Sequence, residues 1–545
     1  MQSAYTVLIL LMLVGVSRLI GRLVPLPLPL VQIGAGAVLA WPSLGLHVAL
    51  DPELFLFLFL PPLLFSDGWR MPKRELWRLR GPILTLAVGL VLFTVVGAGY
   101  FIHWLLPGIP LPVAFALAAV LSPTDAVAVS AIARDRLPAP LMHMLQGEAL
   151  MNDASGLVTF KFALAAAITG VFSLAGASLA FVLVAVGGLL VGVALSWLVG
   201  RLRAWMIARG WDDPATHVVF MLLLPFAAYV LAERLGASGI LSAVAAGMMQ
   251  SWLDLLPRQT GTRLLNRSVW SLLEFAFNGL IFLLLGLQLP DIIKAVTSHE
   301  PTLWPTLFYR CLDVVAIFLV LLVLRFVWVQ SIWRVSGLLR RWRGERELTL
   351  VPTARSCWLL TFGGVRGAVT LAGVLSVPLL LSAGVEFPER DLLIFIAAGV
   401  ILLSLIAACI ALPLLLRGIE KSPDDKRRNE VREAWRKTAE AAIHALEIEE
   451  ASAAPDAAQA ALATEVKARL MSEYRHQLEV FNDSAEAQAL AFEMDLLERR
   501  LRLKAYRAQR LELYRLSRHH QIGDDVLREV LGELDLAEAN LGLGK

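Results

Sequence analysis

Long apolar stretches, separated by short polar or basic segments, fill the chain from Tyr5 to Leu416. An α-helix needs about 20 predominantly apolar residues to cross the hydrocarbon core of a bilayer, and by this criterion we predict about thirteen membrane-spanning helices. They begin near Tyr5, Leu30, Glu53, Gly81, Pro112, Leu141, Ala177, Thr216, Ala237, Val269, Leu303, Ser356 and Asp391. The pattern is typical of an all-α polytopic membrane protein.

A different pattern begins at Arg417, where Glu, Arg, Ala and Leu recur with the 3.6-residue period of surface helices. We therefore predict two domains, a transmembrane domain at residues 1–416 and a helical tail at residues 417–545. No set of residues in the tail converges like a binding site. We interpret the tail as solvated regulatory helices.

Basic residues alternate between dense and sparse loops along the transmembrane part. The dense loops include Arg70 to Arg80, Arg201 to Arg209 and Arg258 to Arg267. Because loops rich in Lys and Arg face the cytoplasm, the N-terminus is predicted to lie outside and the tail in the cytoplasm. This orientation requires an odd number of spans, which agrees with the number predicted from hydropathy.

The composition supports the same class of protein. Hydrophobic residues make up 57% of the chain and charged residues 17%, whereas an average soluble domain has about 25% charged residues. Cys311, Cys357 and Cys409 lie far apart in apolar stretches, so neither a disulfide framework nor a zinc site is predicted. The net charge of +3 does not indicate a nucleic-acid partner.

Polar residues interrupt the fifth predicted span, in the segment LAAVLSPTDAVAVSAIA. Pro123 removes a backbone donor in mid-span, so we expect the helix to open there and to leave carbonyl groups unpaired. Asp125 is placed to neutralise the positive end of the second half-helix, and the Thr124 carbonyl and hydroxyl are able to face a cation. The alternative is an ordinary proline kink with a capping aspartate.

The next span, in the segment LQGEALMNDASGLVTFKF, carries three polar groups within two turns. Glu148 and Asn152 share one face and Asp153 lies one step round the helix. Burial favours the protonated form of a carboxyl group and a bound cation favours the ionised form, so one carboxylate holds either a proton or a cation. The alternatives are that Asp153 is a buried acid paired with Lys161 or an arginine, and that Asn152 only bonds between helices.

The twelfth predicted span repeats the irregularity. In TFGGVRGAVTLAG, Gly363, Gly364 and Gly367 surround Arg366, and glycines at mid-span indicate a second opened helix. The two broken spans run in opposite directions, as expected of an inverted repeat with two crossed discontinuous helices. A buried arginine needs an anion, and we predict a structural ion pair between Arg366 and Glu148.

These segments resemble a known family. LPPLLFSDGW, SPTDAVAVSAI, GEALMNDASG, FNGLIFLLLGLQL and GGVRGAVTLAG, in that order, are similar to the sodium/proton antiporters of the NhaP and NHE type, within the cation:proton antiporter superfamily. The resemblance covers residues 5–416 and is closest to the bacterial branch. It implies a homodimer in which a core domain moves against a dimerisation domain.

Carried over by position, the resemblance assigns roles to individual residues. It implies that Asp153 is the carboxylate that binds the ion and the proton, with Asn152 as its partner. It implies that Thr124 and Asp125 are residues of the opened helix, and that Na⁺ binds at Asp153 and Thr124. Asp67 matches an acidic position that assists the site in some relatives.

Two further implications concern the helix that carries Asp153. The family commonly has Ser where this chain has Ala149, four residues before Asp153, so a plausible cation ligand is missing. In the electrogenic branch a second acid replaces the asparagine, so Asn152 implies one proton for each monovalent cation. The resemblance also assigns Glu148 and Arg366 to a core ion pair.

We predict that the protein exchanges monovalent cations for protons across a bacterial plasma membrane. The main cation expected is Na⁺, and the expected physiological role is pH homeostasis. No enzymatic activity, cofactor or nucleic-acid partner is predicted; the partners are the transported ions, the bilayer and a second copy. A cation channel or a transporter-like sensor is the alternative. An intramembrane aspartyl protease would use Asp125 and Asp153, but neither lies in a G-x-G-D sequence.

One prediction comes from depth in the membrane alone. Lys161 lies about 12 Å beyond Asp153 along the same helix at 1.5 Å per residue, still within the apolar run. Asp313, on a span of opposite direction, falls at a similar depth. We predict an ion pair between Lys161 and Asp313. The alternative is that Lys161 snorkels outward or lines a water-filled outer funnel, and that Asp313 pairs with Arg310, three residues away.

Overall fold

The computed structural model describes residues 2–23, 26–40, 52–134, 136–169, 174–211, 213–254, 260–297, 303–343, 354–378, 387–417, 425–448, 457–482, 485–519 and 521–542. Regular structure within these ranges is helical throughout. The chain divides into two compact units, Met1–Ile419 and Glu420–Lys545. The first unit is the one that the hydropathy predicts to be transmembrane.

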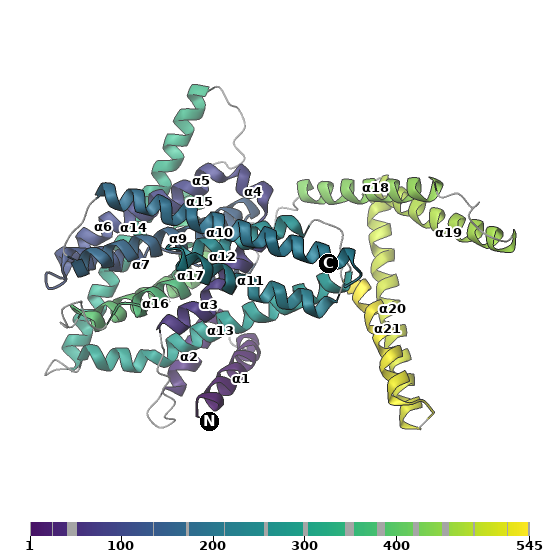
Figure 1. The fold of residues 1–545 in the computed structure, drawn as a ribbon, viewed down its shortest axis with the longest axis horizontal. Helices are drawn as coiled ribbons and strands as arrows, with labels where there is room; N and C mark the ends of the chain where they lie inside the picture. The colour runs from purple at the N-terminus through teal and green to yellow at the C-terminus, as the bar shows by residue number, and fades with distance from the viewer. Residues whose placement is uncertain are drawn as a thin grey trace. The chain divides into compact units, whose positions relative to one another are not determined.

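The first unit is a bundle of helices that pack side by side (Figure 1). Its N-terminal part contains α1 (Gln2–Leu23), α2 (Leu28–Leu39), α3 (Pro52–Arg70), the short α4 (Lys73–Arg78) and α5 (Arg80–Leu84), a π-helical turn η1 (Thr85–Gly89) and α6 (Leu90–Leu105). Its middle contains α7 (Leu111–Val120), α8 (Ala126–Ala133), α9 (Ala139–Thr169), α10 (Leu174–Ala208), α11 (Pro214–Arg234) and α12 (Gly239–Leu253). Its last part contains α13 (Thr260–Thr297), α14 (Leu303–Arg343), α15 (Ala354–Phe362), α16 (Ala368–Leu375) and α17 (Arg390–Leu415).

These helices agree with the fold class predicted from hydropathy. A helix begins within a few residues of almost every predicted start; α13 is the exception, because it begins at Thr260 and the prediction placed its start near Val269. In the described ranges, six helices are long and apolar enough to cross a bilayer by themselves. The all-helical polytopic fold is confirmed, while the number of thirteen crossings stays a prediction.

Both predicted helix openings are present. Helix α7 ends at Val120 and α8 begins at Ala126, around Pro123, while α15 ends at Phe362 and α16 begins at Ala368. An interrupted helix leaves backbone groups without intrahelical partners, which must be satisfied inside a membrane protein. The backbone groups that each break leaves free therefore need partners, and the other break supplies some of them.

The two breaks contact each other directly. The Asp125 amide donates to the Val365 carbonyl at 2.7 Å, and Arg366 Nε donates to the Leu121 carbonyl at 3.0 Å. A Cβ atom at Gly367 would clash with the Asp125 carboxylate, so only glycine allows this approach. The two discontinuous helices cross here, as the inverted repeat predicts.

Glycines also bring intact helices together. On α9, Gly156 lies against the ring of Pro123, and a Cβ at this position would overlap the ring. Gly36 of α2 faces the backbone of α13 at Leu283, and Gly247 of α12 faces the backbone of α3 at Phe65. Small residues let helix backbones approach closely where lipid provides no hydrophobic drive for association. These glycines bring α9 against the first break, α2 against α13 and α12 against α3.

The second unit contains α18 (Asp425–Ile448), α19 (Ala457–Asn482), α20 (Ala485–Arg518) and α21 (Asp524–Gly542). Helix α18 packs against α19, and α20 against α21. Arg510 of α20 forms ion pairs with Asp535 and Glu538 of α21. The described residues of the second unit are helical, in agreement with the periodicity, while its role as a cytoplasmic regulatory domain stays a prediction.

Candidate functional site

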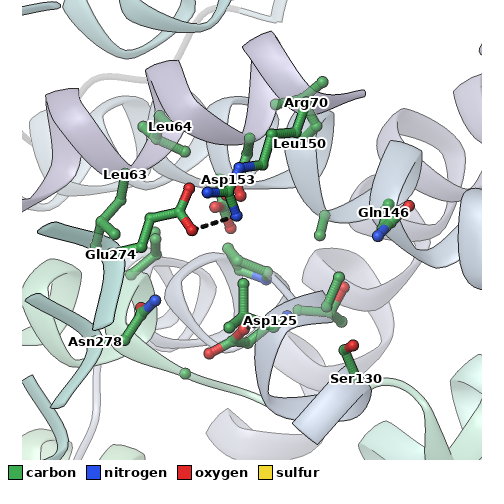
Figure 2. Close-up of a pocket in the computed structure, with 18 of the residues that line it drawn as sticks. Leu63, Leu64, Arg70, Asp125, Ser130, Gln146, Leu150, Asp153, Glu274 and Asn278 are labelled. Atoms are coloured by element: carbon green, nitrogen blue, oxygen red, sulfur yellow. Dashed lines mark hydrogen bonds and ion pairs between the residues drawn. The ribbon is translucent and has the colours of Figure 1, made fainter. Parts of the chain in front are cut away.

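A cavity of about 550 Å³ lies beside the first helix break (Figure 2). Its walls come from α3, the break before α8, α8 itself, α9, α13 and the start of α16 after the second break. Charged and polar side chains line it, namely Asp67, Asp125, Asp153, Glu274, Arg70, Arg134, Thr124, Ser130, Gln146, Asn278 and Thr370. Four carboxylates around one cavity, within an apolar bundle, form an environment that attracts cations.

Asp153 on α9 lines this cavity and is 8% exposed. Among the residues that the structure describes, none donates a hydrogen bond to its carboxylate and none forms an ion pair with it. The alternative of a structural pair between Asp153 and Lys161 is wrong, because Lys161 bonds elsewhere. The Asp153 carboxylate is therefore available to a cation or a proton that enters the cavity.

Asn152 points away from the cavity and holds the break. Its Nδ2 donates to Thr124 Oγ1 at 2.9 Å, and the Thr124 amide donates to Asn152 Oδ1 at 3.4 Å. The side chain is 1% exposed and is absent from the cavity lining. In this structure these hydrogen bonds join α9 to the opened helix, while the role of Asn152 as partner of Asp153 in ion binding stays a prediction.

Asp125 caps the second half-helix. Its Oδ1 accepts hydrogen bonds from the amides of Val127 at 2.9 Å and Ala128 at 3.0 Å. A carboxylate at this place satisfies two of the free amides and complements the positive end of α8. The predicted neutralisation of the half-helix is confirmed. Asp125 also lines the cavity, so the same residue contributes negative charge to it.

The predicted ion pair between Glu148 and Arg366 is wrong in its partner. Glu148, which is fully buried, pairs with Arg325 of α14, whose guanidinium donates to both carboxylate oxygens, one of them at 2.8 Å. Arg325 Nε also donates to the Leu360 carbonyl at 2.9 Å. The bidentate fork of an arginine suits this geometry, and it crosslinks α9, α14 and α15.

Arg366 serves the breaks instead. Besides Leu121, its guanidinium donates to the Gly364 carbonyl at 2.6 Å, so it satisfies carbonyls that the two opened helices leave free.

Arg325 was not predicted from the sequence, although its position marks it as a candidate. A charge in the apolar segment LVLLVLRFVWVQ meets the same criterion that singled out Glu148 and Asp153.

Asp67 and Glu274 add two more carboxylates to the lining, from α3 and α13. Glu274 of α13 accepts a hydrogen bond from Ser66 and forms an ion pair with Arg70, which Figure 2 draws as a dashed line. Asp67, which the family resemblance singled out, lines the cavity from α3. Glu274 was missed, although its place in the apolar segment SLLEFAFNGLIF marks it as a candidate.

The predicted pair between Lys161 and Asp313 is also wrong. Lys161 Nζ lies 3.2 Å from Glu233 of α11, and the lysine side chain is 61% exposed. Asp313 pairs with Arg310 at 3.5 Å, as the alternative stated. The Lys161 side chain is not enclosed by protein, so it does not need Asp313 as a partner, although the two residues lie at a similar depth in the membrane. Glu233 is nearer and also accepts from the Gly239 amide at 3.2 Å.

Ala149 lines the cavity one helical turn before Asp153. Replacing it with Ser places a hydroxyl on this face, and one extra neutral ligand contributes roughly 0.5–1.5 kcal/mol, or about two- to tenfold in affinity. We expect Ala149→Ser to shift the apparent cation affinity or preference by that amount. Transport measured across an alkali-cation series tests this, with Ala167→Ser on the same helix as control. Unchanged affinity and preference would show that this face of α9 does not touch the ion.

Two crossed helix breaks beside a buried acidic cavity, within a bundle of apolar helices, define a membrane carrier for cations. Residues 7–418 match the family described as "Sodium/hydrogen exchanger, transmembrane". The chain belongs to the sodium/hydrogen exchanger family.

Relatives and solved structures agree with this family. The chain is 45% identical to the uncharacterized Na(+)/H(+) exchanger YjcE of Escherichia coli K12, over 99% of both chains. It is 42% identical to a sodium, potassium, lithium and rubidium/H(+) antiporter of Bacillus pumilus, over 99% of this chain and 78% of the relative. Its fold is similar to that of the sodium proton antiporter MjNhaP1 of Methanocaldococcus jannaschii, with a TM-score of 0.58 and 18% identity, over 77% of this chain and 100% of that one.

Proposed function

We propose that the protein exchanges a monovalent cation for a proton at Asp153. The observation that carries this proposal is that the Asp153 carboxylate lines an acidic cavity and has no protein partner among the described residues. A carboxylate in this position binds a proton or a cation, but not both at once. Release of one therefore accompanies binding of the other.

The lining supplies the remaining cation ligands. Hard monovalent cations prefer oxygen ligands, and Asp67, Thr124 and Asp125 offer oxygens around the same space as Asp153. Asn152 contributes indirectly, because its two hydrogen bonds fix the position of Thr124. Water is able to take the place of the hydroxyl that Ala149 lacks.

Alternating access completes the cycle. The cavity reaches Arg70 and Arg134, which the distribution of basic residues assigns to the cytoplasmic side, so it corresponds to an inward-facing state. On α9, one turn beyond Asp153, Gly156 packs against the ring of Pro123, and we infer that this contact closes the outer side. Movement of α9 and the two breaks relative to α3 and α13 opens the outer side. We place the protein in a bacterial plasma membrane as a homodimer, with Na⁺ as its first substrate and K⁺, Li⁺ and Rb⁺ as candidates.

Exchange is expected to be electroneutral, because in this proposal Asp153 is the one carboxylate that exchanges: Asn152 does not titrate, Asp125 is engaged as a helix cap, Glu274 is paired with Arg70, and Asp67 keeps its protonation state through the cycle. One proton then leaves as one monovalent cation binds. In proteoliposomes, Na⁺-driven proton release should keep the same rate when a thiocyanate gradient imposes a membrane potential. A rate that follows the potential would refute one-for-one exchange, and a current without proton release would indicate a channel.

A further inference from the structure

A second cavity, of about 580 Å³, lies in the first unit and carries a surplus of positive charge. The ends of α3, α10 and α12 and the first turns of α13 form its walls. Four arginines line it, Arg70, Arg203, Arg263 and Arg267, and one aspartate, Asp254. The side chain of Arg203 is only 2% exposed, whereas Arg263 and Arg267 are exposed at the mouth.

Two buried polar side chains in this cavity have an unused polar atom. Thr262 is 3% exposed and Asn266 is 6% exposed, and both line the cavity from α13. Thr262 Oγ1 and Asn266 Oδ1 have no hydrogen-bond partner in the described part of the chain. An uncompensated buried polar atom costs free energy, so a ligand that bonds to them is favoured. A hydroxyl is a donor, and a half-turn of the amide presents its NH₂ group to the same space.

A long helix begins at the second cavity. Helix α13 begins at Thr260, and Thr262 and Arg263 lie in its first turn. Free amides and the positive end of the helix dipole attract anions to such a position. The helix start, the arginines and the unpartnered side chains therefore favour the same kind of ligand.

The one carboxylate of the lining is already engaged. Asp254 accepts hydrogen bonds from Trp69 Nε1 at 2.7 Å and from Gln250 Nε2 at 3.0 Å. These bonds hold it against the wall formed by α3 and α12. The exposed guanidinium groups of Arg263 and Arg267 remain at the mouth to meet an anion.

We propose that this second cavity binds a phosphate group. Planar guanidinium forks match phosphate oxygens, and the Thr262 hydroxyl, the Asn266 amide and the start of α13 add donors that are buried behind them. Because the basic loops around residues 201–209 and 258–267 belong to the set predicted to face the cytoplasm, two sources reach the cavity. They are the headgroup of an anionic phospholipid and a soluble phosphate compound.

Phosphate binding has a consequence for the ion cavity, through Arg70. This residue lines both cavities, and its guanidinium pairs with Glu274 in the first one. A phosphate in the second cavity competes with Glu274 for Arg70 and makes the ion cavity more negative, which strengthens cation binding. This consequence rests on the proposed transport function, whereas phosphate binding itself does not.

The test measures binding without transport. Purified, delipidated protein is titrated with pyrophosphate at constant ionic strength, and separately reconstituted in nanodiscs of phosphatidylcholine with or without phosphatidylglycerol. The variants are Arg263→Gln combined with Arg267→Gln, and Thr262→Val, which keeps the volume and removes only the hydroxyl. Arg78→Gln, an exposed arginine of α4 outside both cavities, is the control.

We expect the double variant to bind at least about tenfold more weakly, because losing even one charge-assisted hydrogen bond costs roughly that factor. Thr262→Val should weaken binding by a smaller factor and Arg78→Gln should not change it. If the cavity variants lose the pyrophosphate binding that wild type shows, the ligand is a soluble phosphate compound. If they lose the stabilisation that phosphatidylglycerol gives wild type, the ligand is a lipid headgroup. If neither probe binds wild type better than both cavity variants, the proposal is overturned. A variant that loses exchange activity but still binds phosphate has a defect at the ion site and leaves the phosphate site supported.

Discussion

Asp153→Asn should abolish cation/proton exchange and leave the fold intact. The substitution keeps the shape of the side chain and removes the group that titrates. Asp153 has no hydrogen bond or ion pair to a described residue, so its replacement breaks no contact that holds α9 in place. We therefore expect wild-type yield and elution volume together with no cation-dependent proton flux in proteoliposomes.

The matched control for this variant is Asp313→Asn. Asp313 is another aspartate of the first unit, but it pairs with Arg310 and does not line the ion cavity. This variant should transport at close to the wild-type rate. Normal flux in purified Asp153→Asn would show that the exchange site lies elsewhere.

Removing either partner of the Glu148–Arg325 pair should destabilise the protein severely. The carboxylate is 0% exposed and the guanidinium side chain 3%, and the pair crosslinks α9, α14 and α15. A charge left unpaired at such a depth costs roughly 3–5 kcal/mol. Glu148→Gln and Arg325→Gln should therefore each lower the thermal midpoint and the yield. The double variant should lose much less than the sum of the two.

The surface pair formed by Lys161 and Glu233 is the control for this cycle. The Lys161 side chain is 61% exposed and that of Glu233 34% exposed, so protein encloses this pair much less than it encloses Glu148 and Arg325, and breaking it should cost less. Lys161→Gln should therefore leave the thermal midpoint nearly unchanged. If Glu148→Gln were as stable as wild type and yet inactive, Glu148 would belong to the ion site and not to the scaffold.

The features that sequence reasoning predicted correctly are those fixed by local chemistry. Pro123 cannot continue a helix hydrogen-bond ladder, and the glycines around Arg366 tolerate irregular backbone, so both openings follow from the residues themselves. The cap formed by Asp125 follows in the same way, because it precedes the free amides of α8 by two and three residues. Hydropathy likewise located nearly all helices.

The features that escaped depend on which helices are neighbours. Glu148 has two buried arginines within its region of the fold, and hydropathy gives no means to choose Arg325 over Arg366. The choice follows from geometry: Arg366 lies in a break where free carbonyls occupy its donors, whereas Arg325 approaches from α14 with its fork aligned. Lys161 illustrates the same limit, since its partner Glu233 is 72 residues away in sequence.

The dependence of the apparent cation KM on pH, measured in proteoliposomes of the wild-type protein, tests most directly whether Asp153 holds a cation and a proton in turn. If one proton competes with one cation, the KM should rise as the pH falls, by up to about tenfold per pH unit, while the maximal rate at saturating cation changes little. The sign follows because protons occupy the carboxylate at low pH and must be displaced. A cation KM that stays constant across the pH range of activity would contradict a shared site.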